Sequence, residues 1–190
     1  MVAKKTKIPT KIFELEISIC DIKPRIWRRV AVPHDIKLGK LHDIIQIVFG
    51  WTDSHLHGFT ADDGTIYSQP DPYSGDLDGF LDERKAKLTD LVTDEKQSFM
   101  YQYDFGDDWI HTAKVTKIYA PVDGIKYPVC LAGKRACPPE DIGGVWGYEE
   151  LCQALKNPGK EEYEEMLEWM GDDFDLEEFD IDEVNMMLQG

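Results

Sequence analysis

Three short segments of the sequence concentrate histidines, carboxylates and a cysteine, the residue types that bind metal ions and support hydrolytic chemistry. They are residues 55–57 (His-Leu-His), 103–111 (Tyr-Asp-Phe-Gly-Asp-Asp-Trp-Ile-His) and 137–144 (Cys-Pro-Pro-Glu-Asp-Ile-Gly-Gly). If the first segment is extended, its two imidazoles point the same way and can reach one ion. The candidate metal ligands from the three segments are His55, His57, Asp107, His111, Cys137 and Asp141.

A mixed set of nitrogen, oxygen and sulfur ligands suits zinc or another divalent transition ion. Such an ion lowers the pKa of a bound water and makes it a nucleophile, and Asp107 or Glu140 would then be the general base. This hypothesis predicts a metal-dependent hydrolase-like enzyme. No fixed metal-binding spacing links the three segments, so the pattern leaves the cofactor open.

A second hypothesis is a metal-free site for a small anion, a nucleotide or another small substrate. Arg28 or Arg29 would pair with the anion. Gly143 and Gly144, placed where a helix is expected to begin, would offer backbone N–H groups, and Trp109 completes the candidate set.

The third hypothesis gives the same residues a structural or partner-binding role. Gly106 with Asp107 or Asp108 is typical of a turn, and His111 can be a satisfied core histidine. The sequence contains no nucleophile motif such as Gly-x-Ser-x-Gly. We therefore favour a binding or interaction module whose polar pocket is formed by the three segments, with an unknown protein or small molecule as its ligand.

The register of the expected hairpin around residues 98–119 helps to discriminate between these hypotheses, because a one-residue slip exchanges the two faces. A three-residue turn at 106–108 would pair Phe105 with Trp109 and place His111 across from Tyr103 in an aromatic layer. Asp104 would then lie on the other face and would not share a site with His111. We prefer this register, since it collects the following residues on one face: Phe99, Tyr101, Tyr103, Phe105, Trp109, His111, Ala113 and Val115.

Hydrophobic periodicity indicates the elements that must position these segments. Alternation over 10–19 and 25–32 predicts an opening hairpin, and apolar residues at helical spacing predict a helix over 38–48 that stops at Gly50. Further helices are expected near 148–155, 163–170 and 181–188. Residues 1–9 are expected to be flexible, and 69–82, rich in Pro, Gly, Ser and Asp, to be a long exposed loop.

In the second strand, alternation places an arginine on whichever face is buried. Arg28 shares a face with Ile26 and Val30, whereas Arg29 shares the other with Trp27. We expect the buried arginine to pair with a carboxylate. The chain is therefore predicted to be a single α+β domain over 1–190: a mostly antiparallel sheet of hairpins, one early helix, and a helical, acidic C-terminal part packed against the sheet.

Charge and composition exclude several classes of function. The net charge is −16, and residues 161–190 contain 13 acidic and no basic side chains, which argues against direct nucleic-acid binding. No apolar run approaches the length of a membrane span, and the N-terminal residues lead into a strand and not into a signal-peptide apolar segment. The four cysteines form no Cys-x-x-Cys pair, so we expect reduced thiols in a cytoplasmic protein.

Four segments together resemble the plasmid pRiA4b ORF-3-like family: 26–30 (Ile-Trp-Arg-Arg-Val), 51–59, 103–111 and 137–144. The resemblance runs in order from about residue 12 to residue 188. It implies no particular activity, because that family has none established. Loose links of the family to resolvases and repressor-type proteins imply at most a DNA-transaction context, the weakest of our functional hypotheses.

Overall fold

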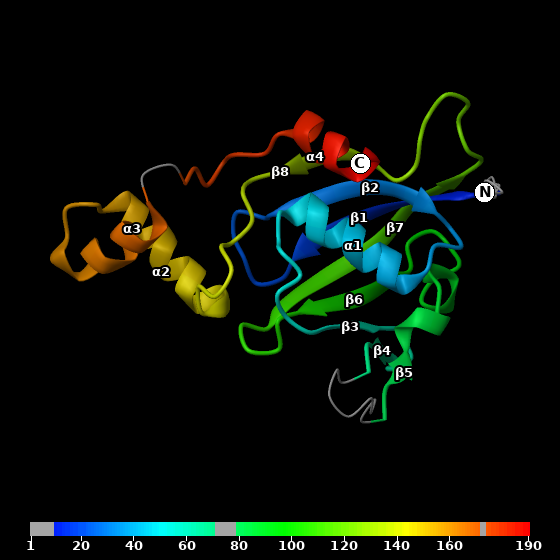
Figure 1. Ribbon diagram of the computed structural model, residues 1–190, viewed down its shortest axis with the longest axis horizontal. Helices are drawn as coiled ribbons and strands as arrows, with labels where there is room; N and C mark the ends of the chain where they lie inside the picture. The colour runs from blue at the N-terminus through cyan, green and yellow to red at the C-terminus, as the bar shows by residue number, and fades with distance from the viewer. Residues whose placement is uncertain (1–9, 71–78, 172–173) are drawn as a thin grey trace, which may run out of the picture.

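The computed structural model describes residues 10–70, 79–171 and 174–190, and its centre is one eight-stranded sheet (Figure 1). The strand order is β5-β4-β3-β6-β7-β1-β2-β8, antiparallel throughout except for the parallel pair β4 and β5. The strands are β1 (Ile12–Ile19), β2 (Trp27–Pro33), β3 (His57–Thr60), β4 (Ile66–Ser68), β5 (Leu81–Asp82), β6 (Ser98–Tyr103), β7 (Trp109–Tyr119) and β8 (Val129–Lys134). This confirms the predicted α+β class.

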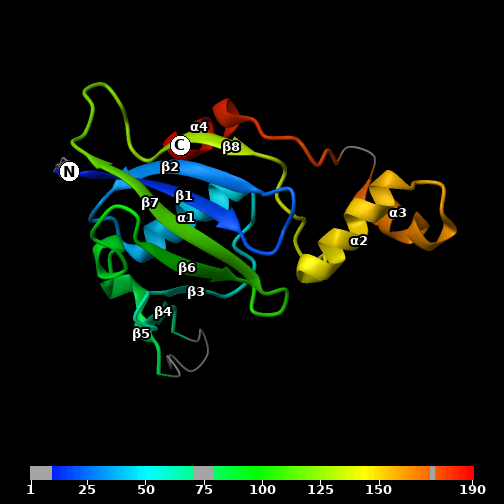
Figure 2. The same ribbon diagram turned by 180° about the vertical axis from the view of Figure 1, so that it is seen from behind.

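One long helix covers a face of the sheet. It is α1 (Leu38–Phe49), whose apolar residues Leu38, Leu41, Ile45 and Val48 are buried, as their spacing predicts. The helix ends at Gly50, whose left-handed φ of 87° a residue with a Cβ rarely adopts. Both views place α1 across the central strands (Figures 1 and 2).

The remaining α-helices follow the last strand in the chain. They are α2 (Gly144–Lys156), α3 (Glu164–Met170) and α4 (Ile181–Gln189), with the short 3-10 turn η3 (Glu161–Tyr163) before α3. Two further 3-10 turns, η1 (Glu83–Lys85) and η2 (Leu88–Asp90), lie between β5 and β6. In both views α4 lies along β8, while α2 and α3 form a pair to one side of the sheet (Figures 1 and 2). Asn185 of α4 accepts from the N–H of Cys130 and donates to its C=O, which satisfies this residue on the open edge of β8.

Among the described residues, the polar partners of the buried arginine are backbone carbonyls and not a carboxylate. Arg28 is 2% exposed, and its guanidinium donates to four backbone carbonyls, those of Val48, Trp27, Lys134 and Arg135, at 2.6–3.0 Å. Its Cζ also lies 4.2 Å from the ring centroid of Phe179. Carbonyl oxygens from α1, β2 and the end of β8 thus accept the guanidinium N–H groups of Arg28. The prediction of a buried ion pair was wrong.

The β6–β7 hairpin has the predicted faces but a longer turn. Tyr103 pairs with Trp109 and Tyr101 with His111, which is two residues away from the predicted register. Five residues, 104–108, form the turn, and Phe105 is 45% exposed instead of paired. A shift of two residues keeps every other side chain on its face, so the aromatic layer is still buried.

The N-terminal residues 1–9 and the loop 69–82 were expected to be flexible and exposed, respectively. Residues 1–9 lie outside the described residues, as do 71–78 of the predicted loop 69–82. The end of that loop differs from the expectation, since Leu81 and Asp82 form β5 beside β4. Within the described ranges, no helix is long and apolar enough to cross a membrane.

Candidate functional site

One histidine and three carboxylates converge where the three chemistry-bearing segments meet. His55 Nε2 lies 3.1 Å from Asp141 Oδ1, 3.6 Å from Asp104 Oδ2 and 3.8 Å from Glu140 Oε2. Ligand atoms of His55, Asp104 and Asp141 all lie within 4.8 Å of one another. His55 comes from the loop between α1 and β3, Asp104 from the β6–β7 turn, and Glu140 and Asp141 from the loop before α2.

Backbone geometry turns two of these carboxylates toward the histidine. Asp104 and Asp141 both have left-handed φ values, 54° and 57°, which aspartate tolerates better than most residues. The Gly106 N–H donates to Asp104 Oδ1 at 2.9 Å, so Oδ2 is the oxygen that faces His55. The turn thus fixes this carboxylate without using both of its oxygens.

Hydrogen bonds to one carboxylate oxygen also hold Glu140 in place. Its Oε1 accepts from Thr52 N (2.9 Å), Thr52 Oγ1 (3.1 Å) and Tyr103 Oη (3.0 Å). Burial raises the pKa of Tyr103, so the phenol stays protonated and donates. Oε2, which is only 3.3 Å from the same phenol, is the oxygen nearer to His55.

The electrostatics of this cluster favour a cation. Within the described residues, the ion pairs of its three carboxylates involve His55 and no lysine or arginine. Carboxylates held this close repel one another unless a positive charge lies between them. His55 Nε2 is shielded from solvent, and none of its contacts to described residues has hydrogen-bond geometry. We call these four residues, His55, Asp104, Glu140 and Asp141, the cation cluster.

Contacts between the segments keep the cluster assembled. The Gly143 N–H donates to Asp107 Oδ2 at 3.0 Å, and a Cβ at Gly144 would overlap the Asp107 carbonyl oxygen. The Trp51 indole N–H donates to the Pro138 carbonyl at 3.2 Å. Both views accordingly place the start of α2 beside the β6–β7 turn (Figures 1 and 2).

The structure separates the other predicted ligands from this cluster. His57 is 2% exposed, and its Nε2 bonds Glu83 at 2.8 Å instead of facing the cluster carboxylates. His111 is fully buried and bonds the Tyr101 and Trp109 carbonyls through Nδ1. The two segment histidines diverge because β3 begins at His57, so the alternation of an extended strand does not reach His55.

Asp107 and Cys137 are the other two predicted ligands outside the cluster. Asp107 directs Oδ2 to the Gly143 N–H, which makes it part of the junction between the β6–β7 turn and α2. Burial raises the pKa of the Cys137 thiol, which disfavours the thiolate that a metal requires. Of the predicted metal set, only His55 and Asp141 lie together.

The residues predicted for anion binding do not form one site either. Arg28 is saturated by carbonyls, as described above, and Arg29 pairs with Glu16 at 3.0 Å and Glu14 at 3.8 Å on the other face of β2. Trp109 is fully buried. Gly143 and Gly144 do open α2, but the Gly143 N–H already holds Asp107.

His42 and His57 form a second histidine group. His42 and His57 stack with ring centroids 3.5 Å apart and an interplanar angle of 6°. His42 Nε2 bonds Asp53 at 2.8 Å, and His57 Nε2 bonds Glu83 at 2.8 Å. Parallel rings point their nitrogen lone pairs side by side and not toward one point, so we assign this pair to hydrogen bonding and not to metal ligation.

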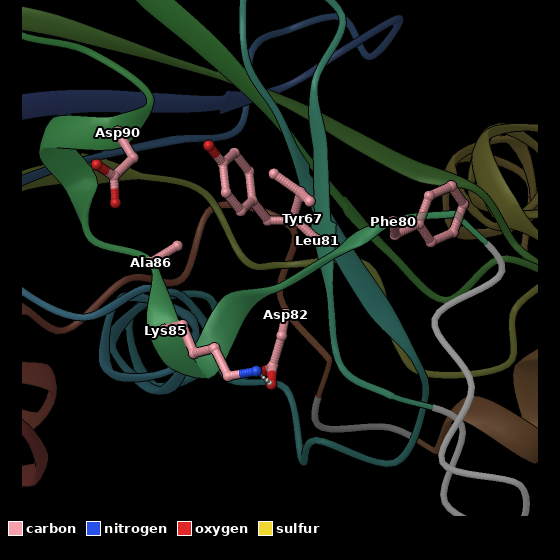
Figure 3. A pocket seen from close by; sticks show the side chains of 7 residues that line it. All are labelled: Tyr67, Phe80, Leu81, Asp82, Lys85, Ala86 and Asp90. Carbon is pink, nitrogen blue, oxygen red and sulfur yellow. Dashed lines mark ion pairs between the residues drawn. The ribbon is translucent and has the colours of Figure 1, made fainter.

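Two hollows lie near these elements. One of about 410 Å³ is bordered by Asp107, Gly143, Gly144 and the 83% exposed Trp146. Another of about 370 Å³ lies at the β4–β5 edge, where Lys85 reaches Asp82, and Tyr67 also lines it (Figure 3). No residue predicted as a site residue lines the second hollow.

Sequence reasoning missed Asp104 as a member of this cluster and treated Glu140 only as a base. The available signal was the tolerance of aspartate for left-handed backbone, which allows the turn to begin at Asp104 and to point its carboxylate at a neighbour. Asp53, His42 and Glu83 were not singled out at all. Their partners come from distant segments, so no local pattern marks them.

Comparisons with known proteins agree over nearly the whole chain. The family model described as "Plasmid pRiA4b ORF-3-like protein" matches residues 11–183. The sequence is 39% identical over 176 residues to the uncharacterized protein y4hQ of Sinorhizobium fredii, a match covering 92% of this chain and 89% of that protein. The crystal structure of MM3350, a protein of unknown function from Methanosarcina mazei Go1, has a TM-score of 0.83 and 43% identity, covering 92% of this chain and 97% of that one.

Proposed function

The chain belongs to the plasmid pRiA4b ORF-3-like protein family, and we propose that it acts as a binding module for a divalent cation. The observation that supports this is the convergence of three carboxylates on His55 Nε2 within 3.1–3.8 Å. The ligands would be His55, Asp104 and Asp141, whose ligand atoms lie within 4.8 Å of one another, and Glu140, which is not part of that group but whose Oε2 lies 3.8 Å from His55 Nε2. This proposal keeps the predicted binding module and the predicted place of its polar pocket, and it names the ligand.

The ligand set indicates the class of ion. One imidazole nitrogen and three carboxylate oxygens suit Zn²⁺ or Mn²⁺. They suit a soft ion such as Cu(I), which prefers sulfur ligands, less well. Asp141 is 72% exposed at its side chain, whereas Asp104 is 10% exposed, so the cluster has one accessible side. An ion there would remain reachable for an outside ligand, which fits a module that presents a cation to a partner.

The hydrolase-like alternative has less support from the geometry. Both candidate bases already accept hydrogen bonds: Glu140 Oε1 from Thr52 and Tyr103, and Asp107 Oδ2 from Gly143. These hydrogen bonds occupy the oxygens that would have to accept a proton from an attacking water. We therefore place binding ahead of catalysis.

Isothermal titration of the metal-stripped, untagged protein with ZnCl₂ and, separately, MnCl₂ tests the proposal. We expect one ion per chain, with affinity lost on His55→Ala. The matched control is His34→Ala, another partly exposed histidine beside an aspartate, with Asp35 at 3.8 Å. Absence of binding, or equal binding by wild type and His55→Ala, would refute the proposal.

A further inference from the structure

A closed ring of hydrogen bonds links the loop that carries His55 to α1 and β6. This loop, residues 51–56, has no helix or strand of its own between α1 and β3. It supplies one ligand of the cation cluster directly, and through Thr52 it holds a second, Glu140. Whatever fixes this loop also fixes the distance between His55 and Glu140.

The ring joins four side chains. The Asp53 N–H donates to Gln46 Oε1 at 2.8 Å, and Gln46 Nε2 donates to Tyr101 Oη at 3.0 Å. Tyr101 Oη lies 2.8 Å from His42 Nδ1, and His42 Nε2 lies 2.8 Å from Asp53 Oδ1. The ring therefore begins and ends on Asp53.

Chemistry fixes the direction of each hydrogen bond in the ring. A carboxylate only accepts, so His42 Nε2 carries the proton and donates to Asp53. Nδ1 of a neutral imidazole then accepts, and the Tyr101 hydroxyl donates to it. Burial lowers the pKa of His42 and raises the pKa of Tyr101, so both groups are neutral as this pattern requires. Every donor in the ring has one acceptor.

Three residues of the ring are buried, and the fourth, Asp53, is exposed. His42, Gln46 and Tyr101 are at most 4% exposed, and the His57 ring stacks on His42 with Glu83 bonded behind it. The Asp53 side chain is 58% exposed and its backbone is left-handed, with φ 56°. The ring thus holds a strained surface loop through one aspartate that is not itself a ligand.

We propose that Asp53, anchored by His42 and Gln46, is a positioning residue of the cation cluster that sets His55 and Thr52 at their working distances from Glu140. This inference rests on the proposed function. Hydrogen bonds that hold metal ligands in place change ion affinity by about 10- to 100-fold when they are removed. Asp53 lies outside the three segments, and its anchors His42 and Gln46 lie on α1.

Titration of Zn²⁺ into three variants separates positioning from charge. Asp53→Ala removes the hydrogen bond and the charge, whereas Asp53→Asn keeps the accepting oxygen and the tolerance for left-handed backbone but removes the charge. Asp62→Ala, an exposed aspartate in the β3–β4 turn, is the matched control. Melting temperatures measured with EDTA check that each variant folds like the wild type.

We expect Asp53→Ala to raise the Kd for Zn²⁺ by about 10-fold or more, with Asp53→Asn and Asp62→Ala within about threefold of wild type. Equal weakening in Asp53→Ala and Asp53→Asn would mean that only charge acts, and an unchanged Kd in Asp53→Ala would mean that the ring does not position the site. Either result overturns the inference while the cation proposal stands. A wild type that binds no Zn²⁺ overturns both.

Discussion

Gly144, the first residue of α2, lies so close to the Asp107 carbonyl oxygen that no side chain fits between them, and its φ of 69° is left-handed. This contact joins the β6–β7 turn, which carries Asp104, to the loop that carries Glu140 and Asp141. The close contact at Gly144 therefore helps to fix the position of Asp104 relative to Glu140 and Asp141.

Gly144→Ala should therefore lower both stability and ion affinity. The left-handed backbone alone costs about 1–2 kcal/mol for a residue with a Cβ, and the overlap with Asp107 adds to it. Urea denaturation and Zn²⁺ titration measure the two effects. Gly159→Ala, where an added Cβ meets nothing within 4 Å, is the control. Equal stability of the two variants would contradict the expectation.

Glu140→Gln should separate the charge of the cluster from its shape. The amide oxygen can still accept from Thr52 and Tyr103, so without an ion we expect stability within about 1 kcal/mol of wild type. Ion affinity should fall by about 10-fold, because one of three negative charges is gone. Glu95→Gln is matched, since Glu95 also accepts a backbone N–H, that of Ile118 at 2.9 Å. Parallel losses of affinity in both variants would point to net charge and not to a local site.

Most of the fold follows from local patterns. Alternation in β1 and β2 and helical spacing in α1 give correct elements because each has one buried face, and the Asp-Gly turn between β3 and β4 is a strong local signal. The face of every residue in the β6–β7 ladder is also predictable. Its register is not, because parity distinguishes odd from even shifts but cannot distinguish a three-residue turn from a five-residue one.

The candidate site is less predictable than the fold. His55 and Asp141 were named from residue type, and the meeting place of the three segments was expected. The separation of His55 from His57 depends on where β3 begins, which is set by pairing with Tyr103 of β6. The anchoring of Asp53 depends on α1 crossing above Tyr101. Both are tertiary facts that no short pattern in one sequence encodes.

Stability should fall as the pH drops from about 6.5 to 4. Burial lowers the pKa of His111 from 6.5 to about 4, and the pKa of His42 shifts in the same direction. The unfolded chain therefore binds protons in this window that the folded chain does not, and each such histidine costs up to about 1.4 kcal/mol per pH unit. Urea denaturation with EDTA at several pH values should show a smaller slope for His111→Phe. An identical slope would exclude His111 as a source.

Arg28→Lys should destabilise the protein far more than Arg29→Lys, although both keep the charge. The Arg28 guanidinium donates to carbonyls of α1, β2, β8 and the segment after β8. Burial lowers the pKa of Arg28 only to about 10, so the side chain is charged at neutral pH. An ammonium cannot reach all four acceptors, and each buried carbonyl left unpaired costs about 1–3 kcal/mol. Arg29 forms a partly exposed ion pair with Glu16, for which about 0–1 kcal/mol is at stake. Urea midpoints compare the two variants, and equal midpoints would show that the carbonyl contacts of Arg28 add nothing beyond its charge.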